Sequence, residues 1–301
     1  MTLPRFNTVN PLILVLLALW TVQPFTAGEL LGDALNPTRS GFQSTLTVAA
    51  WALWAMILIA IAVARPVTLT ISRVGIAGGL VAVIWAAIDL SRRSDTVPAA
   101  TLTLAMVTMI AAVVCANLPG VADRFLNGVS YGTEERYALR PPGPVLIVLV
   151  VPATGLALVG MTAGPLLLAD QQWIAGAVVS AVGLPLAAIA LNALHRLGNR
   201  FLVFVPNGLV IHDLSALSEP VLFVHREMAS LGPARLGTDA TDITAAALGL
   251  VLELRLDQPI ELPLVTGRRH REMQAVSSLL IAPSRPSRVL NTAVERGMTI
   301  A

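Results

Sequence analysis

Residues 46–64 read LTVAAWALWAMILIAIAVA, an apolar run with no charged side chain and no proline. An α-helix rises about 1.5 Å per residue, so about 20 apolar residues cross the hydrocarbon core of a bilayer. A helix also pairs its backbone amides internally, as hydrocarbon requires. This run therefore predicts a membrane-spanning helix.

Five other long stretches carry no charged side chain. They run from Phe6 to Gly28, between Arg73 and Asp89, from Thr96 to Ala122, between Arg140 and Asp170, and from Gln171 to Leu194. The 73–89 stretch is short, and it reaches spanning length if Arg73 and Asp89 lie among the headgroups. The first stretch also allows a cleaved signal peptide, because it ends in the small residues Thr26, Ala27 and Gly28. Residues 1–194 thus predict a domain of about six transmembrane helices, with a cytosolic loop at about 118–144.

The composition supports a membrane protein. Of the 301 residues 55% are hydrophobic and 13% are charged, and the mean hydropathy is +0.75. A net charge of +2 gives no basic field for nucleic acid, and the hydrophobicity excludes a disordered chain. We therefore expect a lipid bilayer around the protein, and no nucleic-acid partner.

Arginines predict the orientation, because they concentrate on the cytoplasmic side of a membrane. With the amino terminus inside, inner segments hold eight arginines: Arg5, Arg65, Arg73, Arg124, Arg136, Arg140, Arg196 and Arg200. The outer loops hold only Arg39, Arg92 and Arg93. This asymmetry predicts a multi-pass inner-membrane protein with both termini in the cytosol.

Residues 195–301 lose the long apolar runs and predict a cytosolic α+β domain, an antiparallel sheet closed by helix. FLVFVPNGLVIHD (201–213) is typical of a hairpin, with Asn207 and Gly208 in its turn. Strands are also predicted at 219–225, 250–256 and 259–265, with Leu250, Leu252, Leu254 and Leu256 facing the interior. Helices are predicted at 271–282 and from Pro286 to Gly297.

The loop at 118–144 contains the first set of candidate site residues. These are Tyr131, Glu134, Glu135, Arg136, Tyr137 and Arg140. Long loops with their own pattern are often functional, so this set predicts a surface for a protein partner or a contact with the carboxy-terminal domain. The alternative is a solvated loop whose arginines only orient the chain.

Within the loop, GVSYG (128–132) matches the G-x-S-x-G pattern of a nucleophilic serine. That pattern requires a strand before the serine and a helix after it. The segment before Ser130 is amphipathic instead, and Pro141 and Pro142 follow closely. A glycine-rich turn explains the motif better than catalysis does.

Asp89, Arg92 and Arg93 form the second candidate set, because a carboxylate joined to a spanning stretch suggests transport. The arginines follow by three and four residues, a spacing that also allows an ion pair at the outer surface.

The histidines lack metal-ligand spacing, and no phosphate loop or dinucleotide fingerprint is present. The sequence therefore predicts no cofactor, metal or catalytic residue. Gly75 with Gly79, and Gly160 with Gly164, predict close helix packing within one chain or in a homodimer.

NGVSYGTEERYALRPPGP (127–144), FLVFVPNGLVIHD (201–213) and IAPSRPSRVLNTAVERG (281–297) resemble an uncharacterised family of actinobacterial multi-pass membrane proteins. The last 107 residues also resemble bacterial pleckstrin-homology-like domains in strand order and terminal helix, although a second terminal helix would depart from them. The resemblance implies an architecture and assigns no activity. The sequence favours a non-enzymatic scaffold that binds a protein partner through its cytosolic domain. A small-solute or lipid transporter is the alternative, and a membrane enzyme is a third.

Overall fold

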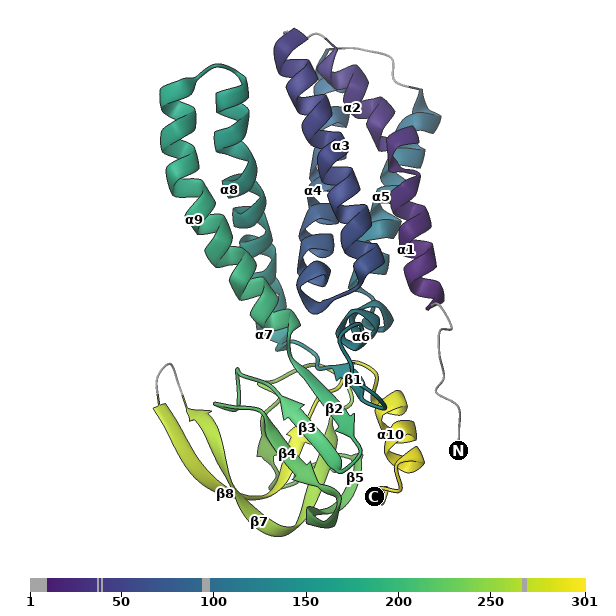
Figure 1. Cartoon of the computed structure of the whole chain (residues 1–301), viewed down its shortest axis with the longest axis vertical. Coiled ribbons are helices and arrows are strands. Elements are labelled where there is room, and N and C mark those ends of the chain that lie inside the picture. The colour runs from purple at the N-terminus through teal and green to yellow at the C-terminus, as the bar shows by residue number, and fades with distance from the viewer. Residues whose placement is uncertain (1–9, 37, 39, 94–97, 267–269) are drawn as a thin grey trace. The chain divides into compact units, whose positions relative to one another are not determined.

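The computed structural model describes residues 10–36, 38, 40–93, 98–266 and 270–301. The chain divides into two compact units, which are described separately (Figure 1). The first, the helical unit, contains the described residues from Asn10 to Val121 and Pro152–Leu194. The second, the β unit, contains Ala122–Val151 and His195–Ala301.

Six helical segments in the described residues are long and apolar enough to cross a membrane, as predicted. The first combines α1 (Pro11–Thr21), a 3₁₀ turn η1 (Gln23–Phe25) and α2 (Ala27–Leu35); the others are α3 (Ser40–Val63), α4 (Pro66–Arg92), α5 (Ala99–Asn117), α8 (Val151–Ala169) and α9 (Trp173–Gly198). Pro24 explains the break in the first segment, because proline lacks the amide hydrogen that a helix interior needs. Arg5 and Arg39, which entered the arginine count, lie outside the described residues.

Indole hydrogen bonds and small residues join these helices. The Trp20 Nε1–H donates to the Trp54 carbonyl (3.0 Å), and Trp54 Nε1–H donates back to the Trp20 carbonyl (2.9 Å). Of the predicted glycines, Gly160 meets the backbone of Gly183, where an added Cβ would overlap its carbonyl oxygen. Gly79 meets Met109 of α5. Packing within the chain therefore occupies these two positions.

The β unit contains two four-stranded sheets. The first has the order β1 (Glu135–Ala138), β2 (Phe201–Val205), β3 (Gly208–His212) and β4 (Val221–Val224), all antiparallel. The second has the order β5 (Met228–Pro233), β7 (Leu252–Thr266), β8 (His270–Ile281) and β6 (Thr241–Asp242), in which β6 runs parallel to β8. The remaining elements are α6 (Pro119–Asn127), α7 (Gly143–Val145), a π-helical turn η2 (Leu146–Val150), a 3₁₀ turn η3 (His225–Glu227) and α10 (Pro286–Glu295).

One apolar core fills the β unit. It includes Leu202, Phe204 and Phe223 of the first sheet and Leu254 and Leu279 of the second, all completely buried. Val289 and Ala293 of α10 belong to the same core. The predicted last helix is thus present, and Gly297 follows it with φ +76°, as expected at a helix end.

Three expectations for this region were wrong. The helix predicted at 271–282 is strand β8, because its apolar side chains pair with those of β7. The two strands predicted at 250–256 and 259–265 are one long strand, β7, whose register shifts between Arg255 and Ile260. Leu250 precedes that strand and is 48% exposed.

The hairpin turn and the domain boundary also differ. Val205 pairs with Gly208, so the turn residues are Pro206 and Asn207. Gly208 lies so close to β4 that a Cβ would overlap the Phe223 carbonyl oxygen. The predicted domain at 195–301 omits Ala122–Val151, which belongs to the β unit because β1 pairs with β2.

Candidate functional site

The candidate site is the central segment, residues 122–143, which the predicted loop contributes to the β unit. Its strand β1 pairs with β2 in a register that runs from Glu135 opposite Phe204 to Ala138 opposite Phe201. Beyond β1, the Leu139 amide donates to the Arg200 carbonyl (2.9 Å), and the Arg140 amide donates to the Ala282 carbonyl (2.8 Å). The segment is therefore held between the first sheet and the chain that follows β8.

Helix α6 holds the amino-terminal side of β1 through two polar side chains. Asn127 donates from Nδ2 to the Arg136 carbonyl (2.7 Å) and accepts at Oδ1 from the Arg136 amide (2.9 Å). Asp123 accepts from the Ala138 amide (2.9 Å) and pairs with Arg285 (3.4 Å). Burial raises the pKa of Asp123, and the Ala138 amide and Arg285 oppose that rise. Both side chains thus satisfy backbone groups that a loop would expose to water.

Tyr137 joins β1 to the last helix. Its hydroxyl donates to Glu135 Oε2 (2.8 Å) and lies 2.7 Å from Thr292 Oγ1 of α10. Its ring packs edge-on against Phe204, with 5.9 Å between ring centroids. Burial raises the pKa of Tyr137 to about 12, and Glu135 adds to the rise while the Thr292 hydrogen bond opposes it. Tyr137 and Glu135 therefore form an internal contact in this unit.

Arg140 and Arg200 lie at the other end of β1. Arg200 donates from Nε and Nη2 to the two carboxylate oxygens of Asp213 (2.8 and 2.5 Å), and both side chains are almost fully buried. Arg200 also donates to the Arg140 carbonyl (3.2 Å). The Arg140 guanidinium in turn donates to the carbonyls of Leu248 (3.0 Å) and Leu250 (3.4 Å). This chain of contacts fastens the central segment to a loop more than 100 residues later in the sequence.

A stack of three planar groups lies on the first sheet. The guanidinium carbon of Arg136 is 5.5 Å from the centroid of the Phe201 ring, and that ring stacks on His212 at 4.5 Å. Arg136 also forms an ion pair with Glu134 (3.2 Å). A cation over an aromatic face is stabilising. The candidate residues Arg136 and Glu134 therefore also have partners within the β unit.

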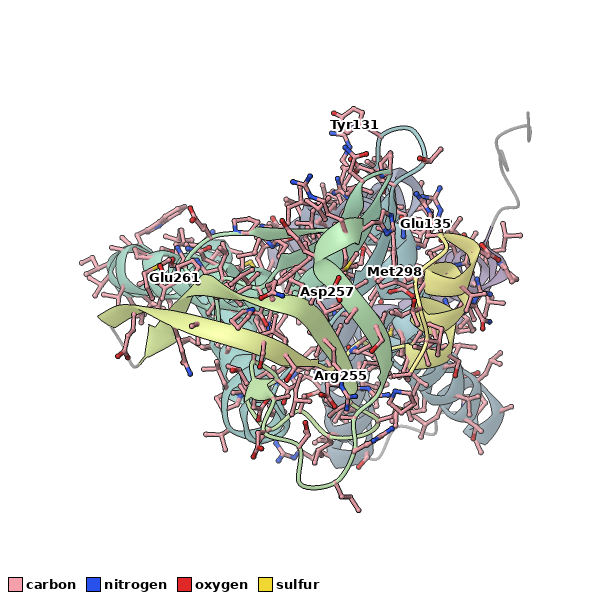
Figure 2. The ribbon with its side chains drawn as sticks, turned by 90° about the horizontal axis from the view of Figure 1, so that it is seen from below. Tyr131, Glu135, Arg255, Asp257, Glu261 and Met298 are labelled. Atoms are coloured by element: carbon pink, nitrogen blue, oxygen red, sulfur yellow. The ribbon has the colours of Figure 1, made fainter. Side chains whose placement is uncertain are left out.

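Tyr131 differs from the other five candidates of this segment because its side chain is 80% exposed. Figure 2 shows it projecting beyond the ribbon at one edge of the β unit, whereas Glu135 lies beside α10. Of the six residues predicted in the loop, Tyr131 is therefore the one most available to another molecule.

The remaining candidates have simple surroundings. The Ser130 hydroxyl donates to Asn127 Oδ1 (3.1 Å), an amide that is not a base, and the serine follows helix α6 rather than a strand. Asp89 forms an ion pair with Arg93, whose Nη1 also donates to the Ala34 carbonyl (3.1 Å). Arg92 is exposed in the last turn of α4. Within the described ranges, no group of three His, Cys, Asp or Glu residues could hold a metal ion.

Nothing in the sequence alone pointed to Asp123, Thr292 or Asp213, or to the role of Arg200. The hairpin could have revealed the buried ion pair, because the register that pairs Phe201 with His212 places Arg200 opposite Asp213. A turn at Asn207 and Gly208 would have placed other residues opposite each other. Asp123 and Thr292 have no comparable signal, because their partners lie far away in sequence.

The chain was compared with family models, curated proteins and solved structures, and none of these comparisons gives a match.

Proposed function

We propose that this chain is a multi-pass inner-membrane protein whose β unit is a cytosolic module that binds a protein partner, a scaffold rather than an enzyme. One observation carries the proposal. The β unit is built from two segments, and the helical hairpin α8–α9 is inserted between them. Strand β1 precedes this hairpin and β2 follows it, yet the two strands pair directly.

This pairing ties the two ends of the hairpin together. Only Asn199 and Arg200 separate α9 from β2, and Arg200 is itself buried in an ion pair. A module on a flexible linker could bind a partner without affecting its membrane anchor. Here the paired strands β1 and β2 attach the module to both ends of the helical hairpin, so a partner bound to the module is attached to both helices.

Tyr131 is the residue on which this function can be tested. Exposed aromatic side chains are enriched in protein interfaces, and Tyr131 lies in the turn between α6 and β1. Thr133 is exposed in the same turn and offers a matched control. In native membranes, a photo-crosslinking amino acid at position 131 of the full chain should give one discrete adduct with another protein. The same amino acid at Thr133 should give much less of it, and equal or absent adducts at both positions would contradict the proposal.

Transport is the alternative function, and Asp89 is its candidate residue because carboxylates within membrane spans often mark ion or proton pathways. In the structure Asp89 is ion-paired with Arg93, the residue that follows the end of α4. We therefore favour the scaffold. Asp89→Asn should leave solute flux in proteoliposomes unchanged, and a loss of flux would favour the transporter instead. The inner-membrane location, a homodimer and the pleckstrin-homology-like resemblance stay predictions.

A further inference from the structure

A loop of the β unit exposes an uncharged apolar surface. Residues 243–252 read ITAAALGLVL and contain no charged side chain. Within this loop Leu248 is 74% exposed and Leu250 is 48% exposed, and Ala245, Ala246 and Gly249 are exposed as well. Leucines grouped in this way on a surface are typical of a contact with another apolar phase.

The loop has a fixed conformation. Arg140 donates to the carbonyls of Leu248 and Leu250, and the Gly143 amide donates to the Ala246 carbonyl (3.4 Å). Gly249 has φ +105°, and a Cβ there would overlap the Arg140 guanidinium. Ala245 and Ala246 hold the left-handed conformation at φ +52° and +59°, which is costly for alanine. Backbone strain of this kind often marks a functional segment.

The point of attachment suggests what the loop contacts. Gly143 begins α7, which continues through η2 directly into α8. Val148 is the first residue of the candidate membrane span Val148–Ala169, only five residues after Gly143. Five helical residues rise about 8 Å, and the headgroup layer on each side of a bilayer is about 5 to 8 Å thick. A Cβ on Gly143 would lie 3.0 Å from Leu248 Cγ, so Leu248 packs against a residue five positions before the first residue of this candidate span.

We propose that the loop at 243–252 inserts Leu248 and Leu250 into the headgroup region of the bilayer beside the start of α8. The occupant of this surface is lipid, because the loop is fastened to the chain at the membrane entry of a spanning helix. The inference rests on the proposed function, since it requires Val148–Ala169 to cross a bilayer. It adds a second, peripheral attachment of the β unit to the membrane.

The test uses the full chain with Cys115→Ser and one introduced cysteine at a time. Leu248→Cys reports on the loop, and Leu222→Cys, on β4 and 46% exposed, is the matched control in the same unit. Val182→Cys, 58% exposed near the middle of α9, reports on the span itself. Each protein is labelled with a polarity-sensitive fluorophore and reconstituted into phosphatidylcholine and phosphatidylglycerol vesicles. The vesicles contain nitroxide lipids labelled at a shallow or a deep position.

The label at position 248 should emit at shorter wavelength than the label at 222 and lose intensity with the shallow quencher. The label at 182 should respond to the deep quencher. Quenching at 182 with equal behaviour at 248 and 222 would overturn this inference and leave the membrane proposal intact. A blue shift at 248 without quenching would also overturn it, because protein rather than lipid would cover the loop. No quenching at 182 would overturn the membrane proposal itself.

Discussion

The hydroxyl oxygens of Tyr137 and Thr292 lie 2.7 Å apart and join the strand before the helical hairpin to the last helix of the chain. Both residues are buried, and Glu135 accepts from the Tyr137 hydroxyl. The central segment is therefore an integral part of the β unit, and its contacts can be tested one by one.

Tyr137→Phe should lower the free energy of unfolding of the β unit by about 1 to 3 kcal/mol, because it leaves buried polar partners without the phenol hydroxyl. Tyr131→Phe is the matched control, since Tyr131 is exposed. Hydrogen exchange of the β1 and β2 amides in the full-length protein measures the effect. Equal protection in both variants would show that the Tyr137 hydrogen bonds contribute nothing.

The raised pKa of Tyr137 predicts that the folded β unit loses stability as the pH rises, whereas acid denaturation is a loss of stability as the pH falls. A folded-state pKa of about 12, above the usual value of 10, favours the neutral phenol in the folded protein. The resulting stability is fully present below pH 10 and is lost as pH rises through about 12. A near-ultraviolet tyrosinate titration should show a step near pH 12 that Tyr137→Phe removes. A step near pH 10 that disappears in this variant would contradict the burial of the phenol.

The two-segment construction predicts that residues 196–301 alone fold poorly. That fragment lacks β1, together with Tyr137 and Leu139 of the core. A chain that joins residues 122–142 to 199–301 through a short glycine-serine linker restores both. Circular dichroism should show a cooperative thermal transition for the joined chain and a weaker or absent one for 196–301. The same melting temperature in both would show that β1 is dispensable.

The sequence predicts well those elements whose signal is local. The six apolar runs are sufficient to locate the helical segments, because a spanning helix needs only length and hydrophobicity. The hairpin at 201–212 follows from its Asn207–Gly208 signal, although the turn itself lies one residue earlier, and the last helix follows from Pro286 at its start. The signal for each of these elements lies within its own stretch of sequence.

The sequence does not predict those strands whose formation depends on a pairing strand elsewhere in the chain. Residues 273, 276 and 280 have helical spacing, yet β8 forms because β7 offers a complementary edge and places Val276 and Leu279 in the core. Strand β1 is short, and its partner β2 lies more than 60 residues later, beyond the helical hairpin. The sequence left open whether the loop at 118–144 makes contacts, with a partner or the carboxy-terminal domain, or is only solvated. The pairing of β1 with β2 gives the geometry of its contact with that domain.

The ion pair between Arg200 and Asp213 should be the most sensitive polar contact of the β unit. Removing one member of a buried pair leaves an uncompensated charge and costs about 3 to 5 kcal/mol. Arg200→Met should therefore unfold the β unit or greatly reduce the protection of its amides. Glu134→Gln is the control, because its pair with Arg136 is partly exposed, and exposed pairs contribute about 0 to 1 kcal/mol. A double variant, Arg200→Met with Asp213→Leu, should recover part of the loss, and its failure to do so would exclude the buried charge as the cause.

The orientation of the protein is tested by thiol labelling in a Cys115→Ser background. Gln172 lies in the turn between α8 and α9, and Thr133 lies in the exposed turn before β1. The helix α8 separates these two turns, so a membrane-spanning α8 places them on opposite sides. Because the arginine asymmetry predicts a cytosolic central segment, an impermeant maleimide added to intact cells should label Gln172→Cys and leave Thr133→Cys unreacted until the cells are opened. Labelling of Thr133→Cys alone would reverse the orientation, and labelling of both positions in intact cells would show that α8 does not cross the membrane.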